Sequence, residues 1–139
     1  MIAFEEINLL SILLVENHTT FANVLSRLVN RAGNLQVTQF AETAESALQH
    51  LTEQKFDLAL VDVSLPQMSG ISFVALVHDA YPDLPCLMIS GHMVQLYVKR
   101  SLEAGARGYV LKDNSAGILE GIQHVLDGEI YLSQELQDV

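Results

Sequence analysis

The sequence predicts an α/β fold in which a parallel sheet lies between two layers of helices. Five short apolar runs of strand length alternate along the chain with five stretches whose apolar residues recur at helical spacing. Parallel strands need crossover connections, and those crossovers are right-handed. Five such units around an open sheet predict the strand order 2-1-3-4-5.

The five predicted strands are apolar runs bounded by polar or turn-forming residues. They cover residues 11–15, 35–40, 58–61, 85–90 and 107–111. The run 58–61 reads Leu-Ala-Leu-Val without polar alternation, which is typical of a central strand covered on both faces. The run 35–40 alternates, with Leu35 and Val37 on one side and Phe40 on the other, so we expect an edge strand.

The predicted helices begin near capping residues and end near glycine or proline. Their apolar stripes cover residues 21–29, 44–51, 71–77, 93–104 and 115–126. We expect Thr43 and Ser115 to be N-caps, since a hydroxyl can accept from the first free amides of a helix. In the fourth helix, the residues expected to pack inward are Met93, Leu96, Tyr97 and Leu102.

Composition bounds the class of protein. The chain has 139 residues, half of them hydrophobic, which fits one domain with its own core. A formal net charge of -10 repels phosphate, so we expect no direct contact with nucleic acid or an anionic membrane. The single cysteine, Cys86, lies in an apolar run and is expected to be a core residue. With no signal-peptide pattern and no membrane-length apolar run, a cytoplasmic location is expected.

Polar residues follow four of the five predicted strands, each at the point where the strand ends. They are Glu16, Asn17, Asp62, Ser90 and Lys112. Because the carboxyl ends of parallel strands share one edge of a sheet, these side chains should converge. Singly, each has a plain alternative, such as a helix cap for Asp62, a turn hydroxyl for Ser90 or a solvated lysine for Lys112. Their joint occurrence in this order favours a site.

The chemistry of this group suggests phosphoryl transfer. Carboxylate and amide oxygens are suited to Mg²⁺, while lysine and serine are donors suited to phosphoryl oxygens. A carboxylate beside a metal ion and an ammonium group can attack phosphorus, because the charge on the transferring group is neutralised from several sides. We therefore interpret Asp62 as the acceptor.

Four ordered motifs resemble the receiver domains of two-component response regulators. They are ILLVENH, DVSLPQMSG, MISGH and GYVLKD, and the resemblance covers residues 11–131. It implies a flavodoxin-like (βα)5 three-layer sandwich, with Asp62 as the phosphoacceptor and Lys112 as the cation that pairs with the phosphoryl group. Ser90 would be the hydroxyl that moves toward it, and the rotamer of Tyr109 would report the state. The implied donor is a sensor histidine kinase or a phosphotransfer protein.

The resemblance also implies a metal site, from which this sequence departs. The family normally places two acidic residues after the first strand, and here the pair is Glu16 and Asn17. With Asp62 and the backbone carbonyl of Ser64 they would bind Mg²⁺, but Asn17 brings no charge, so weak binding is expected. The side chains of Ser64 and His92 occupy positions that tune hydrolysis in the family. The alternative function is a pseudo-receiver that binds partners without phosphorylation.

The ends of the chain suggest a larger context. Residues 1–8 are expected to be a leader, 9–131 the receiver domain, and 132–139 a tail or the start of a linker to an absent output domain. The ending is most like receivers of the NarL/FixJ type, which regulate transcription and can form homodimers. No basic recognition helix occurs in this sequence.

Two other protein classes share parts of this pattern. A haloacid-dehalogenase-like phosphohydrolase would need an acidic residue where Ser64 stands. A flavodoxin would need a loop rich in Ser, Thr and Gly after its first strand, where this chain has Glu16 and no glycine. The expected protein is a signalling domain rather than an enzyme, with magnesium-dependent self-phosphorylation at most.

Overall fold

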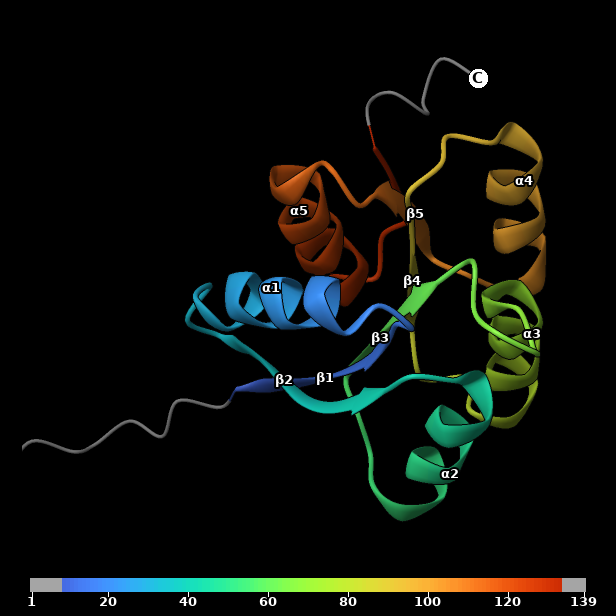
Figure 1. The fold of residues 1–139 in the computed structure, drawn as a ribbon, viewed down its shortest axis with the longest axis horizontal. Coiled ribbons are helices and arrows are strands. Elements are labelled where there is room, and N and C mark those ends of the chain that lie inside the picture. The colour runs from blue at the N-terminus through green and yellow to red at the C-terminus, as the bar shows by residue number, and fades with distance from the viewer. Residues whose placement is uncertain (1–8, 134–139) are drawn as a thin grey trace, which may run out of the picture.

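The structure is a computed structural model that describes residues 9–133, and it shows a parallel sheet between two layers of helices (Figure 1). The elements in chain order are β1 (Leu10–Val15), α1 (Thr19–Asn30), β2 (Leu35–Ala41), α2 (Ala44–Glu53), β3 (Leu58–Asp62), α3 (Gly70–Ala80), β4 (Cys86–Ser90), α4 (Gln95–Ala104), β5 (Gly108–Leu111), α5 (Ser115–Leu126) and β6 (Tyr131–Leu132). Among the described residues, no helix is long and apolar enough to span a membrane.

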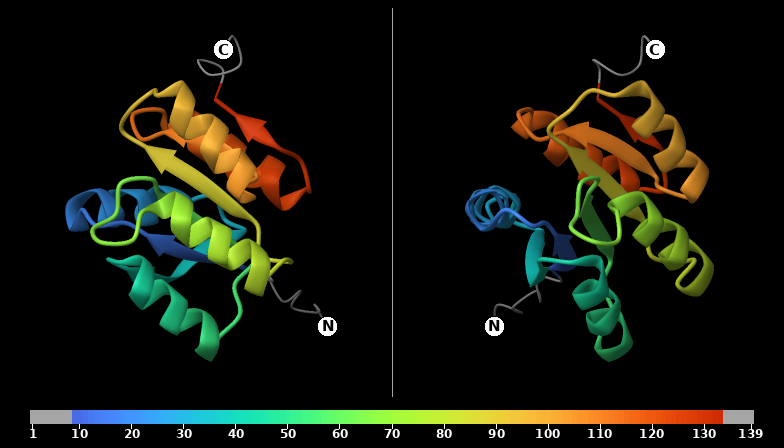
Figure 2. Two further views of the ribbon diagram at one scale, coloured as in Figure 1. Left: turned by 90° about the vertical axis from the view of Figure 1, so that its right-hand side faces the viewer. Right: turned by 45° about the vertical axis from the view of Figure 1, so that its right-hand side comes forward.

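The sheet order is β2-β1-β3-β4-β5-β6, and every neighbouring pair is parallel. The predicted order of the first five strands is therefore confirmed. The sixth strand, at the edge beside β5 (Figure 2), was not predicted, because two residues are too short to show a period. The amide of Tyr131 donates to the carbonyl of Arg107, and that of Ser133 to the carbonyl of Tyr109. The sheet thus continues past residue 131.

Two apolar cores hold the layers together. Helices α1 and α5 cover one face of the sheet, and α2, α3 and α4 cover the other (Figures 1 and 2). Both faces of β3 are buried, so its residues alternate between the two cores, with Leu58 and Leu60 in one and Ala59 and Val61 in the other. The unbroken apolar run that predicted a central strand is the consequence of this double coverage.

A bulge in β2 makes one prediction for the edge strand wrong. Ile12 pairs with Val37, but Leu13 pairs with Gln39, so the register skips Thr38. One extra residue reverses the alternation beyond it. Phe40 therefore packs in the same core as Val37 instead of on the opposite face.

The inward face of α4 also differs from the prediction. The helix begins at Gln95, and Met93, Leu96 and Tyr97 are 57%, 48% and 37% exposed. Its buried positions are Val98 and Ser101, and Leu102 packs beside them as expected. The Ser101 hydroxyl donates to the carbonyl of Tyr97 at 2.6 Å, which satisfies it within the helix. A hydrophobic pattern cannot reveal that a serine will be buried in this way.

The capping predictions were half right. The Thr43 side chain accepts from the Ser46 amide at 3.0 Å, as expected. At α5 the N-cap is Asn114, whose Oδ1 accepts from Gly117 at 2.8 Å, and Ser115 is instead the first helical residue. Asparagine and serine are comparable caps, so their order alone did not distinguish them. Cys86 is a core residue as predicted, and burial raises the pKa of its thiol to about 12.

Candidate functional site

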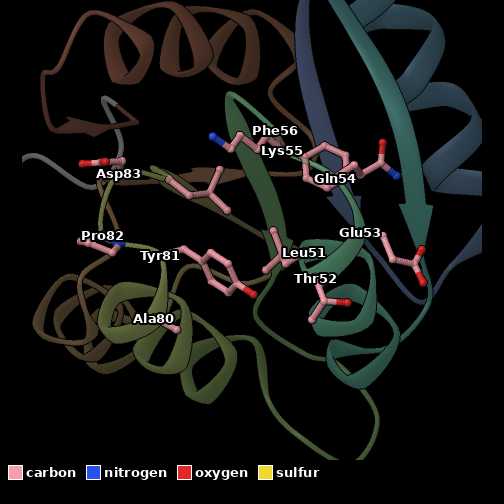
Figure 3. A pocket seen from close by; sticks show the side chains of 11 residues that line it. Leu51, Thr52, Glu53, Gln54, Lys55, Phe56, Ala80, Tyr81, Pro82 and Asp83 are labelled. Atoms are coloured by element: carbon pink, nitrogen blue, oxygen red, sulfur yellow. The ribbon is translucent and has the colours of Figure 1, made fainter.

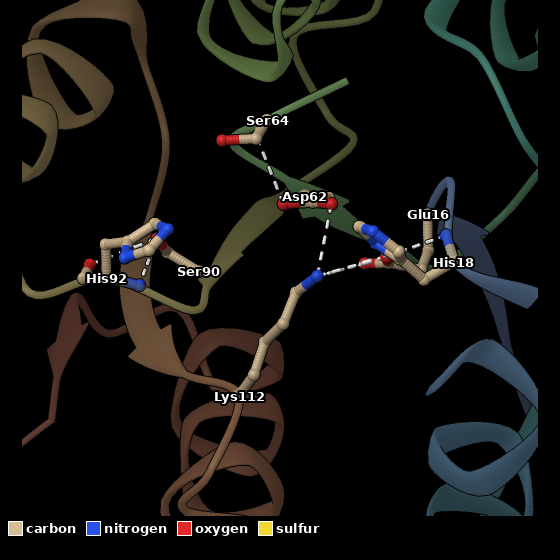
Figure 4. Close-up of polar contacts among 7 residues, drawn as sticks. All are labelled: Glu16, His18, Asp62, Ser64, Ser90, His92 and Lys112. Carbon is tan, nitrogen blue, oxygen red and sulfur yellow. Dashed lines mark hydrogen bonds and ion pairs between the residues drawn. The ribbon is translucent and has the colours of Figure 1, made fainter. Parts of the chain in front are cut away.

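The candidate site lies at the carboxyl ends of β1, β3, β4 and β5 (Figure 4). Glu16 follows β1, Asp62 and Ser90 end β3 and β4, and Lys112 follows β5. The side chains of Glu16, Asp62 and Ser90 are buried. The structure therefore brings these four predicted residues to one edge, whereas the side chain of Asn17 is exposed beside them.

The Lys112 ammonium group joins the two buried carboxylates. Its Nζ lies 3.0 Å from Oε1 and 2.9 Å from Oε2 of Glu16, and 3.2 Å from Oδ2 of Asp62. The Lys112 amide donates to the Ser90 carbonyl at 2.9 Å, which fixes the backbone from which the side chain extends. The ammonium also lies 4.8 Å from the centre of the Phe21 ring on α1. One cation therefore compensates two negative charges.

Asp62 is held on both sides of its carboxylate. Oδ1 accepts from the Ser64 amide at 3.0 Å, and Oδ2 faces Lys112. Burial and the neighbouring charge of Glu16 raise the pKa of Asp62, although the Ser64 hydrogen bond and Lys112 oppose that rise. The folded protein consequently holds this charge at a cost, which an added cation would relieve.

Ser90 and Tyr109 meet at one carbonyl oxygen. The Ser90 hydroxyl donates to the His92 carbonyl and accepts from the His92 amide, both at 3.0 Å. The Tyr109 ring is buried, and its hydroxyl donates to the same carbonyl at 3.4 Å. Burial raises the pKa of Tyr109. The loop after β4 therefore holds both side chains through its backbone.

Sequence reasoning missed His18 as a member of the site. Its ring Nδ1 and its backbone amide both lie 3.0 Å from Oε1 of Glu16. Ligand atoms of Glu16, His18 and Asp62 all lie within 4.8 Å of one another, so this set fits a divalent cation. The sequence held one sign of this role: His18 comes two residues after Glu16, in the loop between β1 and α1.

The structure shows why a glycine, Gly70, stands eight residues after Asp62. Its amide donates to the Val63 carbonyl at 3.0 Å, and a Cβ added to it would overlap the backbone carbonyl of Asp62. The start of α3 can approach the end of β3 only without a side chain here. Gly70 thus fixes the loop that carries Ser64.

A separate pocket of about 550 Å³ lies at the other end of the sheet, between the end of α2 and the connection from α3 to β4 (Figure 3). It is lined by Leu51, Thr52, Glu53, Gln54, Lys55, Phe56, Ala80, Tyr81, Pro82, Asp83 and Leu84. None of the predicted site residues lines it.

Comparison with known proteins decides the family. Residues 12–123 match the response regulator receiver domain. The chain belongs to this family. The receiver domain is 27% identical to the transcriptional regulatory protein DegU of Brevibacillus brevis, over 90% of this chain and 53% of that protein. It is 31% identical to the transcriptional activator protein ExaE of Pseudomonas putida, over 91% of this chain and 60% of that protein. It thus spans between half and two thirds of these relatives.

Solved structures agree with this assignment. A LuxR-family response regulator from an Aurantimonas species superposes with a TM-score of 0.90 at 25% identity, covering 94% of each chain. A CheY-like receiver domain from Methanospirillum hungatei gives 0.78 at 30% identity, covering 86% of this chain and 95% of that one. Receiver domains are signalling domains that bind Mg²⁺ in an acidic pocket and interact with histidine kinases. The phosphohydrolase and flavodoxin alternatives are therefore set aside.

Asp62→Asn is expected to raise the free energy of unfolding at pH 7. The pKa of Asp62 is raised above its ordinary value of 3.8, so ionisation costs folding free energy once the pH exceeds 3.8. The difference in free energy of unfolding between the variant and the natural chain should shrink as the pH falls. It should vanish below 3.8, where Asp62 is protonated in both the folded and the unfolded state. Urea unfolding across this range measures it. Asp79→Asn, an exposed control, should change little, and a destabilised Asp62→Asn at pH 7 would contradict the interpretation.

Gly70→Ala is expected to lower the free energy of unfolding by about 1–3 kcal/mol, because the new methyl group must displace backbone atoms. Gly91→Ala is the matched control, since a Cβ there meets nothing within 4 Å. Urea titration of both variants is the measurement. Equal stability of the two variants would show that the close approach at Gly70 has no energetic weight.

Proposed function

We propose that this receiver domain accepts a phosphoryl group on Asp62 from a sensor histidine kinase or a phosphotransfer protein. The observation that carries the proposal is the buried Asp62 carboxylate, whose Oδ2 lies 3.2 Å from the Lys112 ammonium beside the buried Glu16. A carboxylate oxygen of Asp62 attacks phosphorus as the P–N bond of the phosphohistidine breaks, and the released imidazole takes up a proton. Lys112 then pairs with the new phosphoryl oxygens.

The proposed metal ligands are Glu16, Asn17, Asp62 and the backbone carbonyl of Ser64. Bound Mg²⁺ would neutralise charge on the transferring group. Asn17 offers an exposed neutral amide where a carboxylate would add charge, so we propose a weakened magnesium site. We propose that the side chains of Ser64 and His92, both exposed, tune hydrolysis of the phosphoaspartate.

The proposed switch begins at the His92 carbonyl. A phosphoryl group on Asp62 adds acceptor oxygens that compete for the Ser90 hydroxyl, now held by the loop. The Tyr109 hydroxyl donates to the same carbonyl, and we propose that its rotamer changes when Ser90 shifts. The change then reaches the surface of α4, β5 and α5, where a partner or a second copy would bind.

The longer relatives suggest the context of this domain. We propose that the receiver, residues 9–131 behind a leader at 1–8, is the regulatory part of a transcription regulator. The linker to its output domain would then begin after Ser133, because Leu132 lies in β6 and the Ser133 amide bonds to β5. The relatives named as transcription regulators are longer than this chain, which supports the proposal. With a net charge of -10, this segment itself would not contact DNA.

The second candidate is a pseudo-receiver that binds partners without phosphorylation. The uncharged Asn17 favours it, because a weak metal site leaves the transferring charge less neutralised. The contacts of Lys112 with Asp62 and Glu16 oppose it, since they keep the acceptor beside its cation.

Incubation with acetyl phosphate and Mg²⁺ is expected to add one phosphoryl group, detected by intact mass. The gain should require Mg²⁺ and disappear in Asp62→Ala. Asn17→Asp should raise the affinity for Mg²⁺ by about tenfold, as one added charge at ligand distance would. Failure of the natural chain at high Mg²⁺, with gain restored by Asn17→Asp, would favour the pseudo-receiver.

A further inference from the structure

His18 stands where the weakened magnesium site could gain another ligand. The residue before it, Asn17, is uncharged and exposed. The His18 ring lies against Glu16, with Nδ1 at 3.0 Å from Oε1, and Figure 4 shows it on the same side of the pocket as that carboxylate. The pocket thus presents an imidazole nitrogen beside two carboxylates, from Glu16 and Asp62.

The Glu16 carboxylate provides a second, independent observation. Its side chain is fully buried, and its Oε2 faces the Lys112 ammonium. Lys112 Nζ lies 2.9 Å from this oxygen, and no other donor among the described residues contacts it. A carboxylate oxygen carries two lone pairs, so the lone pair of Oε2 that does not face Lys112 is open to a metal ion.

The distances permit coordination. Ligand atoms of Glu16, His18 and Asp62 lie within 4.8 Å of one another. Two ligands of one metal at about 2.0–2.2 Å are at most roughly 4.4 Å apart. The His18 side chain is 68% exposed, so a small rotation closes the difference without repacking the core.

The donor types determine the class of ion. Mg²⁺ prefers oxygen ligands throughout, whereas imidazole suits first-row transition ions such as Co²⁺ and Zn²⁺. We propose that His18 joins Glu16 and Asp62 in binding a divalent transition ion, and that this pocket prefers such an ion to Mg²⁺. The inference rests on the proposed function, because it names the metal of the same site.

Charge in the pocket is consistent with this assignment. Ionised Glu16 and Asp62 with the Lys112 ammonium give the pocket a net charge of about -1, and a divalent ion makes it about +1. An anionic phosphoryl group is then attracted instead of repelled. Because His18 is a neutral ligand and not a third carboxylate, the pocket with the ion bound keeps its net positive charge.

The test is calorimetric titration of Co²⁺ and, separately, of Mg²⁺ into the metal-free 139-residue chain. The expected result is one Co²⁺ bound at least about tenfold more tightly than Mg²⁺. His18→Ala and His18→Gln should each weaken Co²⁺ binding about tenfold and leave Mg²⁺ binding within about twofold. Proton NMR of the Co²⁺ form should show paramagnetically shifted imidazole signals that both variants lose.

His92→Ala is the matched control, because it removes an exposed histidine from the same pocket but lies outside the cluster. It should keep the natural Co²⁺ affinity. His18→Gln guards against a folding defect at the start of α1, which thermal unfolding would reveal. Unchanged Co²⁺ affinity in both folded His18 variants, or equal loss in His92→Ala, would overturn the inference.

The acetyl phosphate assay with Mg²⁺ separates this inference from the proposed function. If the chain is phosphorylated but the His18 variants bind Co²⁺ as tightly as the natural chain, only the choice of metal is overturned. Co²⁺ binding that depends on His18, in a chain that gains no phosphoryl group with either ion, would overturn the proposed function and leave the metal site standing.

Discussion

The pairing of one ammonium group with two buried carboxylates is the interaction on which the rest of the site depends. Glu16 and Asp62 are brought together by neighbouring parallel strands, and their charges repel within a buried pocket. Lys112, which follows β5, reaches both. Without it, two desolvated carboxylates would have no lysine or arginine partner among the described residues, a situation that folded proteins avoid. The distant strands are thus coupled by charge as well as by hydrogen bonds.

The same strands set the path by which the site could affect the surface. β5 carries Tyr109 and is followed by Lys112, and it is flanked on its outer side by β6. The Ser133 amide donates to the Tyr109 carbonyl, so the last described residue is hydrogen-bonded to β5. Ser133 is therefore connected by one backbone hydrogen bond to the strand that Lys112 follows.

The sequence predicted the fold and most of the site because both depend on pattern. Strand periods and the polar residues at strand ends located Asp62, Ser90 and Lys112 at one edge. The failures arose where one local contact reverses a pattern, as the bulge at Thr38 does for Phe40. The prediction for α4 failed for a similar local reason: the Ser101 hydroxyl bonds to a carbonyl of its own helix, so a serine is buried where only apolar residues were expected. His18 was missed because its importance comes from the direction of its ring, which spacing does not determine.

The most direct test of this account is a stability cycle on Lys112 and Glu16. Lys112→Met should lower the free energy of unfolding by about 3–5 kcal/mol, because it leaves two buried carboxylates unpaired. Adding Glu16→Gln to that variant should restore part of the loss, since one of the repelling charges is removed. If the two substitutions are simply additive in urea unfolding, the ammonium does not couple these carboxylates, and the central claim is wrong.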